Sequence, residues 1–259
     1  MTAATRVLQR NLLVYRRTFR GSIFSSFVTP LFYLTAMGLG LGQLVTRDVS
    51  SLPGGDYLSF LGPGIMAATC MQSAVFESTF PIMGKIMWRR NYEAMLATPI
   101  EVRHILGGEL LWIGFRMVLI SSVFLGVLAL FRIPTSFLAL LAVPACVLLG
   151  VAFSAAIISF AATQKNDSGF AAMFRFVINP LFLFSGTFFP LSSLPDSLKW
   201  FEWIAAVTPL YHGVALVRGA VLDESGTLAA WPWHVAYLVT FAAVFAVVAH
   251  RLLSRRLVK

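Results

Sequence analysis

Long apolar runs with very few charges decide what this chain can fold into. Residues 23–45 carry no charged side chain, and five further runs carry few: 57–80, 105–130, 137–162, 169–189 and 231–251. About 20 helical residues, each rising 1.5 Å, cross a hydrocarbon core of about 30 Å. Only 12% of the residues are charged, whereas about a quarter are charged in a soluble domain. The sequence therefore predicts an all-α polytopic membrane protein with six transmembrane helices.

The basic residues predict the orientation of these spans, because Lys and Arg concentrate in cytoplasmic segments of membrane proteins. With the N-terminus inside, only four lie in outer segments: Arg47, Arg132, Lys199 and Arg218. Fourteen lie in inner segments: Arg6, Arg10, Arg16, Arg17, Arg20, Lys85, Arg89, Arg90, Arg103, Lys165, Arg251, Arg255, Arg256 and Lys259. Both termini are therefore predicted to be cytoplasmic, and the net charge of +9 does not indicate nucleic-acid binding.

The N-terminal segment 5–20 predicts an interfacial helix. Its five arginines oppose an apolar stripe formed by Leu8, Leu12, Tyr15 and Phe19. A basic amphipathic helix of this kind lies on the inner membrane surface. The alternative is a frayed basic tail. The start of the chain has no apolar h-region or cleavage site, so we expect no signal peptide to be removed.

The segment 84–98 predicts a second amphipathic helix, between the second and third spans. Arg89 and Glu93 are spaced to form an ion pair, and Thr98-Pro99 ends the helix. Its side chains separate onto an apolar face and a charged face: Trp88, Tyr92, Met95 and Leu96, against Lys85, Arg89, Arg90 and Glu93. Such a helix either lies at the lipid interface or is bound by a soluble partner.

The segment 191–222 predicts two short helices separated by Pro209, neither long enough to span. It is rich in aromatic residues, which favour the boundary between membrane and water. We interpret it as a re-entrant helix pair that dips into the outer leaflet, with an ordinary outer loop as the alternative.

Four ionisable residues lie inside the predicted spans, where an unpaired charge is costly. One interpretation is that Glu77 or Arg175 lines a polar opening to a substrate path. The other, which the rarity of membrane charges favours, is that all four pair among themselves and hold the inner halves of the bundle together. They are Glu77, Glu109, Arg116 and Arg175.

Several kinds of site are not indicated. Cys70 and Cys146 lie within apolar runs, which is typical of small buried residues. The four histidines lack the spacing of a metal site. The only Gly-Lys pair, Gly84-Lys85, is followed by Ile86, so no P-loop for nucleotide phosphates is present.

The motifs support a resemblance to a known family. The stretch SGTFFPLSSLPDSLKWFEWIAAVTPLYHGVALVRG, from Ser185 to Gly219, resembles the span-five exit and following helices of the ABC-2 (type V exporter) permeases. Residues 60–78 and 88–110 are similar to the NodJ and daunorubicin-resistance branch of that family. The resemblance covers essentially the whole chain. It implies an N-terminal connecting helix, six spans, a cytoplasmic coupling helix and a re-entrant pair.

The resemblance also implies how such a chain works. It would be the permease of a bacterial inner-membrane exporter for an amphipathic drug, lipid or lipo-oligosaccharide, and not itself an enzyme. Two permease chains would pair, as a homodimer or a heterodimer, around a path between spans one, two and five. Each would dock an ATP-binding cassette ATPase that holds the ATP and Mg²⁺. An ATP-independent secondary transporter or channel is the alternative, and a membrane enzyme is disfavoured because no catalytic constellation is evident.

Three groups of residues are therefore predicted to act. The ATPase-coupling group is Lys85, Trp88, Arg89, Arg90, Glu93 and Met95. The substrate-path group is Phe24, Phe27, Glu77, Phe174, Arg175 and Phe182. The extracellular-gate group is Phe188, Phe189, Pro190 and Leu194.

Overall fold

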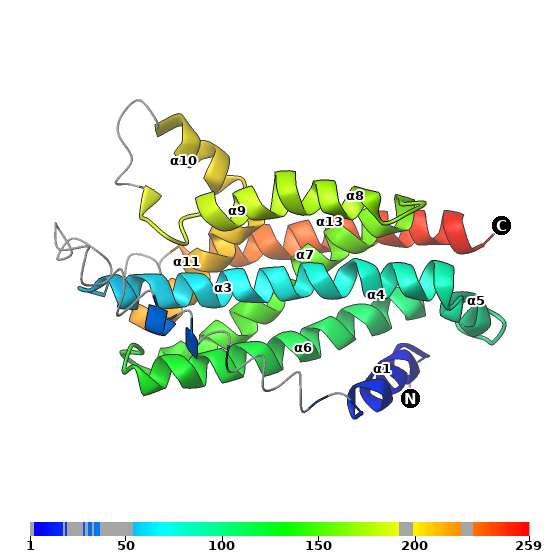
Figure 1. Ribbon diagram of the computed structural model, residues 1–259, viewed down its shortest axis with the longest axis horizontal. Helices are drawn as coiled ribbons and strands as arrows, with labels where there is room; N and C mark the ends of the chain where they lie inside the picture. Colours follow the sequence, from blue (N-terminus) through cyan, green and yellow to red (C-terminus); the bar gives the residue numbers. More distant parts are fainter. Residues whose placement is uncertain are drawn as a thin grey trace.

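A computed structural model describes residues 3–17, 54–191, 199–223 and 230–258, with positions 19, 28, 31, 32 and 34–36 between them (Figure 1). Every regular element among these residues is a helix. Most of the predicted first span, 23–45, lies outside the described residues, as do Phe24, Phe27 and Leu194.

The first half of the chain forms an amphipathic helix and two long helices joined by short helical turns. Its elements are α1 (Ala3–Tyr15), α3 (Tyr57–Ser78), α4 (Phe80–Met83), η3 (Gly84–Trp88), α5 (Asn91–Leu96) and α6 (Val102–Leu130). The second half contains η4 (Phe137–Leu141), α7 (Ala142–Thr163), α8 (Ser168–Met173), η5 (Phe174–Ile178), α9 (Asn179–Phe184), α10 (Lys199–Ala206), α11 (Pro209–Leu222) and α13 (Trp231–Leu257).

Four helices among the described residues are long and apolar enough to cross a membrane. They are Tyr57–Trp88, Val102–Leu130, Phe137–Thr163 and Trp231–Leu257. A fifth apolar helix, Ser168–Phe184, is shorter. The all-helical prediction is confirmed for the described residues, while the count of six spans stays a prediction.

The long helices lie side by side along the molecule, with α7 at their centre (Figure 1). Helix α7 packs against α13, α6 and α3, and α11 packs against α3, α7 and α13. Small residues such as Gly150, Ala152 and Ala155 on α7 let its neighbours approach closely, as is typical of membrane helices. Helix α5 and both ends of the described chain lie at one end of the bundle, and α10 lies at the other (Figure 1).

The segment 84–98 is not one continuous helix. Arg90 adopts a left-handed conformation, with φ +46°, between η3 and α5. This break turns Arg89 away from its i+4 position relative to Glu93. The predicted Arg89–Glu93 ion pair is therefore wrong: it is not among the ion pairs of the described residues.

The last short helix, α11, is more deeply buried than a surface loop would be. Its first turn is capped by the Thr208 hydroxyl, which accepts a hydrogen bond from the backbone N–H of Tyr211 at 3.4 Å. Pro209 follows at the first helical position, where a missing N–H costs nothing. Most α11 side chains are buried between α3, α7 and α13.

Helix α1 is seated on α6 over a glycine. A Cβ added at Gly108 would lie 2.9 Å from the backbone oxygen of Ala4 and 2.7 Å from Cγ1 of Val7. At the neighbouring Gly107 the nearest atom is 3.7 Å away, an ordinary contact. Of these two glycines, only Gly108 is needed for the close approach of α1 to α6.

We predict that Gly108→Ala weakens the seating of α1, whereas Gly107→Ala does not. The backbone of Ala4 cannot yield as a flexible side chain would, so the free energy of unfolding should fall by about 1–3 kcal/mol. Thermal unfolding of the two variants in detergent, followed by tryptophan fluorescence, measures the difference. Equal midpoints for the two variants would contradict this account of the α1–α6 contact.

Candidate functional site

A buried ion pair connects three elements at the α5 end of the bundle. Lys85 on η3 lies 2.7 and 2.6 Å from the two carboxylate oxygens of Glu109 on α6. The Nδ2 of Asn11 on α1 donates to the same carboxylate at 3.1 Å. Glu109 is only 2% exposed and Lys85 13%. A carboxylate this deeply buried is tolerated only when it is paired and hydrogen-bonded.

Tyr92 extends this cluster to α5. Its side chain is fully buried beside Glu109. Burial, and then the negative charge of Glu109, raise the pKa of Tyr92 well above that of a free tyrosine, so the phenol stays neutral. The segment between α3 and α6 is thus attached to the bundle through Lys85 and Tyr92.

A second ion pair borders the same cavity, about two helical turns farther along α6. Nε of Arg116 on α6 is 3.2 Å from Oε1 of Glu77 on α3. The guanidinium also lies over the ring of Tyr15 on α1, 5.0 Å from its centroid, and that ring meets Trp112 edge-on at 5.4 Å. The hypothesis that the four charged residues within the spans pair among themselves therefore holds for Glu77 and Arg116. Glu109 pairs instead with Lys85, which lies outside that group.

The two ion pairs border one open cavity of about 510 Å³. It lies between α1, the α4–η3 segment and α6. Charged, polar and aromatic side chains all line it: Arg10, Asn11, Val14, Tyr15, Glu77, Pro81, Lys85, Arg89, Trp112 and Arg116.

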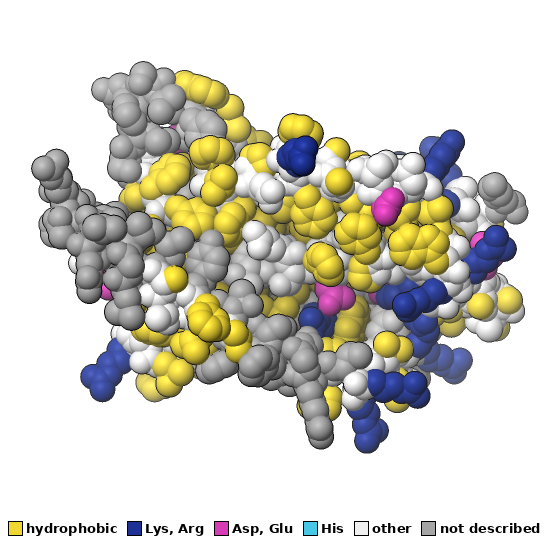
Figure 2. Space-filling model, viewed as in Figure 1, with side chains coloured by type: hydrophobic (Ala, Val, Ile, Leu, Met, Phe, Trp, Pro, Cys, Tyr) yellow, Lys and Arg dark blue, Asp and Glu magenta, His cyan; other side chains and the backbone are white. Residues whose placement is uncertain are grey.

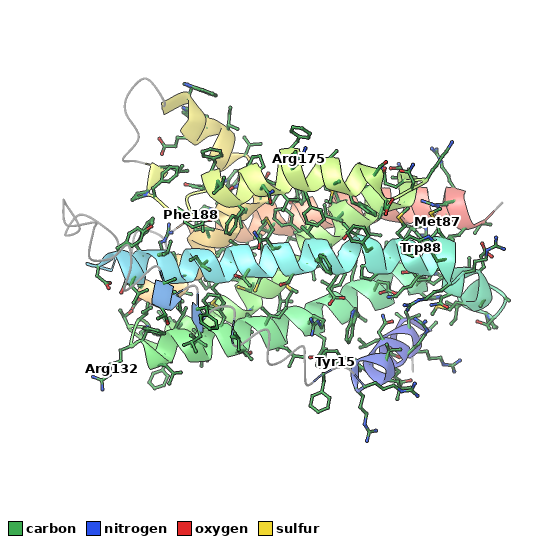
Figure 3. The ribbon with its side chains drawn as sticks, in the orientation of Figure 1. Tyr15, Met87, Trp88, Arg132, Arg175 and Phe188 are labelled. Atoms are coloured by element: carbon green, nitrogen blue, oxygen red, sulfur yellow. The ribbon has the colours of Figure 1, made fainter. Side chains whose placement is uncertain are left out.

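The residues predicted to couple to an ATPase divide into two sets. Trp88 is 64% exposed at the α5 end, where Figure 3 shows it beside Met87. Arg89, Arg90 and Glu93 are also exposed. Lys85 and Met95, by contrast, are largely covered, and Lys85 is committed to Glu109. The exposed side chains can contact a partner directly. Lys85 can affect such a partner only by fixing the position of η3.

The described substrate-path residues lie on α3 and on the α8–η5–α9 helix. Phe174 and Phe182 are half-buried, and Arg175 is exposed. Arg175 makes none of the ion pairs seen among the described residues, and Figure 3 places it between the Trp88 end and the Phe188 end. Phe174 and Arg175 begin the π-helical turn η5. Lys85 and Trp88 lie in a second π-helical turn, η3. Such turns are frequent at functional sites.

The described gate residues, Phe188, Phe189 and Pro190, are half-buried where the α9 segment leaves the bundle. The ring of Phe188 meets that of Phe182 edge-on, with centroids 5.0 Å apart. A predicted path residue and a predicted gate residue are therefore in contact.

Arg218 is a residue whose importance the sequence did not indicate, because it was counted as an outer-loop charge. The structure places its guanidinium 3.9 Å from the centroid of the Phe60 ring. Its Nη2 donates to the backbone oxygens of Phe60, at 3.3 Å, and Gly186, at 3.0 Å. Arg218 thus joins α11 to the start of α3 and to the exit of the α9 segment.

Two histidines that seemed scattered in the sequence are also neighbours. The Nδ1 atoms of His212 on α11 and His234 on α13 are 2.7 Å apart, and His212 stacks on Tyr237 at 3.9 Å. Within the described ranges, no three His, Cys, Asp or Glu side chains are grouped so as to hold a metal ion. The pair joins α11 to the last long helix.

The fold and site together define a class. A multi-pass helical bundle with an amphipathic N-terminal helix and an exposed, aromatic-bearing segment between two long helices has the organisation expected of a transporter's membrane subunit. The family model for ABC-2 type transporters matches residues 2–222, and this chain belongs to that family. It is a membrane subunit without an ATPase domain, and permeases of this family pair with an ATP-binding cassette ATPase.

Similar proteins extend over almost the full length. Nodulation protein J of Rhizobium leguminosarum bv. viciae is 32% identical over 254 residues, covering 98% of this chain and 94% of the relative. Nodulation protein J of Bradyrhizobium diazoefficiens is 30% identical, with the same two coverages. The inner membrane transport permease YadH of Escherichia coli is 23% identical over 239 residues, covering 89% and 88%. The predicted family is therefore confirmed.

We predict that Lys85→Met destabilises the protein strongly, by about 3–5 kcal/mol, because it leaves the Glu109 carboxylate buried and unpaired. The double variant Lys85→Met/Glu109→Gln should recover most of that loss, since the amide carries no charge. Chemical denaturation in detergent measures both.

The exposed pair Arg103–Glu101, whose atoms lie 2.8 Å apart, is the matched control. Arg103→Met should cost no more than about 1 kcal/mol, because water screens this pair. Similar losses for Lys85→Met and Arg103→Met would show that burial does not govern the Lys85–Glu109 contact.

Proposed function

We propose that this chain is the permease subunit of an ATP-binding cassette exporter in a bacterial inner membrane. It would have six spans, both termini in the cytoplasm, and a second permease copy as its partner, a homodimer in the first instance and a heterodimer as the alternative. A separate ATPase would hold ATP and Mg²⁺ and supply the energy. The cargo would be an amphipathic drug, lipid or lipo-oligosaccharide taken from the cytoplasm or inner leaflet.

The observation that carries this proposal is the exposed surface from Trp88 to Glu93. A tryptophan that is 64% exposed beside two arginines and a glutamate has the composition of a protein-binding hot spot with a charged rim. It lies beyond the end of a long apolar helix, where a soluble subunit can reach it. The same segment would be poorly suited to floating in lipid, since its charges surround the indole.

The helix Tyr57–Trp88 offers a route from this surface to the far end of the bundle. Its first turn is held by Arg218 through the Phe60 carbonyl, and the same guanidinium binds the Gly186 carbonyl. Its last turns are held by Lys85. A displacement of η3 by the ATPase would therefore be passed along α4 and α3, which meet at Thr79, toward the exit segment that Arg218 joins to α3.

In this mechanism ATP closes the two ATPase subunits, which push on Trp88, Arg90 and Glu93. The two permease chains then rock, the inner side of the path closes, and the cargo leaves past Phe188 and Phe189. The exposed faces of Phe174, Arg175 and Phe182 would line the path between the two copies. The cationic Arg175 favours a cargo with an anionic or strongly polar group beside its apolar part.

An ATP-independent secondary transporter remains the competing function. Proton-coupled carriers place ionisable groups near the middle of the membrane. Both span carboxylates described here, Glu77 and Glu109, are instead engaged by Arg116 and Lys85 near the α1 end. This pairing favours the ATP-driven reading.

We predict that Trp88→Ala/Arg90→Glu abolishes coupling to the ATPase while membrane insertion stays normal. The variant removes the indole anchor and reverses one rim charge, so ATPase retention should fall at least tenfold, the effect of one interface hot spot. The measurement is co-purification with the co-expressed ATPase, followed by ATP hydrolysis in lipid nanodiscs with and without the permease.

The matched control is Arg251→Glu/Arg255→Glu, which reverses exposed charges at the same end of the bundle on α13. It should leave ATPase retention nearly unchanged. Wild-type ATPase retention in the Trp88/Arg90 variant, or solute movement by the permease alone without any ATPase, would overturn the proposed function.

A further inference from the structure

The cavity between α1, η3 and α6 has a charge imbalance that the coupling mechanism does not use. Four cationic side chains line it, together with one carboxylate. Glu77 neutralises Arg116, and Glu109, just behind the wall, neutralises Lys85. Arg10 and Arg89 have no carboxylate partner among the described residues. The cavity therefore retains an excess of positive charge around an open volume.

Two guanidinium groups facing one cavity suit a tetrahedral oxyanion. Each guanidinium presents a planar fork of N–H donors that matches phosphate oxygens, and such charge-assisted bonds are stronger than neutral ones. A neutral sugar or an apolar drug would leave this excess of charge uncompensated, so the chemistry selects an anion.

The rest of the lining is apolar and suits a molecule that is only partly polar. Val14, Tyr15, Pro81 and Trp112 also line the cavity, interleaved with the cationic side chains on the same elements. A volume of about 510 Å³ is in the range of small-molecule sites and larger than one phosphate ion requires. The geometry thus fits a phosphate group attached to an apolar or glycerol-like body.

The location of the cavity supplies a source for such a molecule. Helix α1 contains basic and no acidic residues, and Figure 2 shows Lys and Arg gathered at the end of the molecule that carries α1 and α5. A basic helix is attracted to the anionic surface of the inner leaflet. The cavity opens beside this helix, where the headgroups of that leaflet would lie.

We propose that this cavity binds a phosphate group, and that its occupant is the headgroup of an anionic inner-leaflet phospholipid. The phosphate lies between Arg10 on α1 and Arg89 at the end of η3. A bound headgroup therefore holds the connecting helix against the coupling segment. This inference rests on the proposed function only for the orientation of α1 toward the inner leaflet.

The test uses the purified full-length permease in neutral detergent, without an ATPase. Native mass spectrometry compares retention of phosphatidylglycerol with that of zwitterionic phosphatidylcholine. A parallel thermal-shift titration uses inorganic phosphate. The variant Arg10→Gln/Arg89→Gln removes the two lining cations that lack a carboxylate partner among the described residues. The variant Arg6→Gln/Arg17→Gln removes the same charge from exposed positions of the N-terminal segment that do not line the cavity.

Wild-type protein should retain phosphatidylglycerol at least tenfold better than phosphatidylcholine. The Arg10/Arg89 variant should lose about tenfold or more of that binding, the effect of removing charged hydrogen bonds. The Arg6/Arg17 variant should retain it. Stabilisation by inorganic phosphate that is lost in the Arg10/Arg89 variant would support the phosphate site with a free anion as its occupant.

Two results would overturn the proposal. One is that the wild-type protein retains the two lipids equally and is not thermally stabilised by phosphate. This result does not depend on whether any variant folds. The other is an equal loss in the Arg6/Arg17 control, which would indicate only diffuse surface charge. Neither measurement involves the ATPase, so a failure of coupling and a failure of this site are distinguishable.

Discussion

The Lys85–Glu109 pair is the contact on which the α5 end of this bundle depends. It removes two charges from water at a point where η3, α6 and, through Asn11, α1 converge. A buried pair contributes little net stability compared with apolar packing, but breaking it is costly, because one charge is left behind. Its effect is to specify one arrangement of three elements.

This arrangement bears on how a coupling segment can work. Trp88, Arg90 and Glu93 lie outward, while Lys85 and Tyr92 anchor the same segment inward. The left-handed Arg90 separates the anchored π-helical turn from the short helix α5. In the proposed mechanism, a force on the exposed side chains would reach the bundle through Lys85 and Tyr92. At the opposite end, Arg218 plays a comparable part by joining α3, α11 and the α9 exit.

Much of this could be predicted from the sequence. The apolar runs predicted as spans overlap the long helices α3, α6, α7 and α13, because a helix satisfies all of its backbone hydrogen bonds within one segment. Periodicity identified α1, and the breaks at Pro99 and Pro209 placed the short helices. The family was evident from the motif that runs from Ser185 to Gly219.

What the sequence alone determined was the class: an all-helical membrane protein of the ABC-2 family, since composition and local pattern are properties of neighbouring residues. Which side chains pair with one another was decided only by the tertiary structure. Glu109 pairs with Lys85 and not Arg116, Arg89 faces a cavity and not Glu93, and His212 meets His234 across two helices. Each depends on how helices distant in sequence pack and on where the chain breaks at Arg90, and no spacing along one helix contains that information.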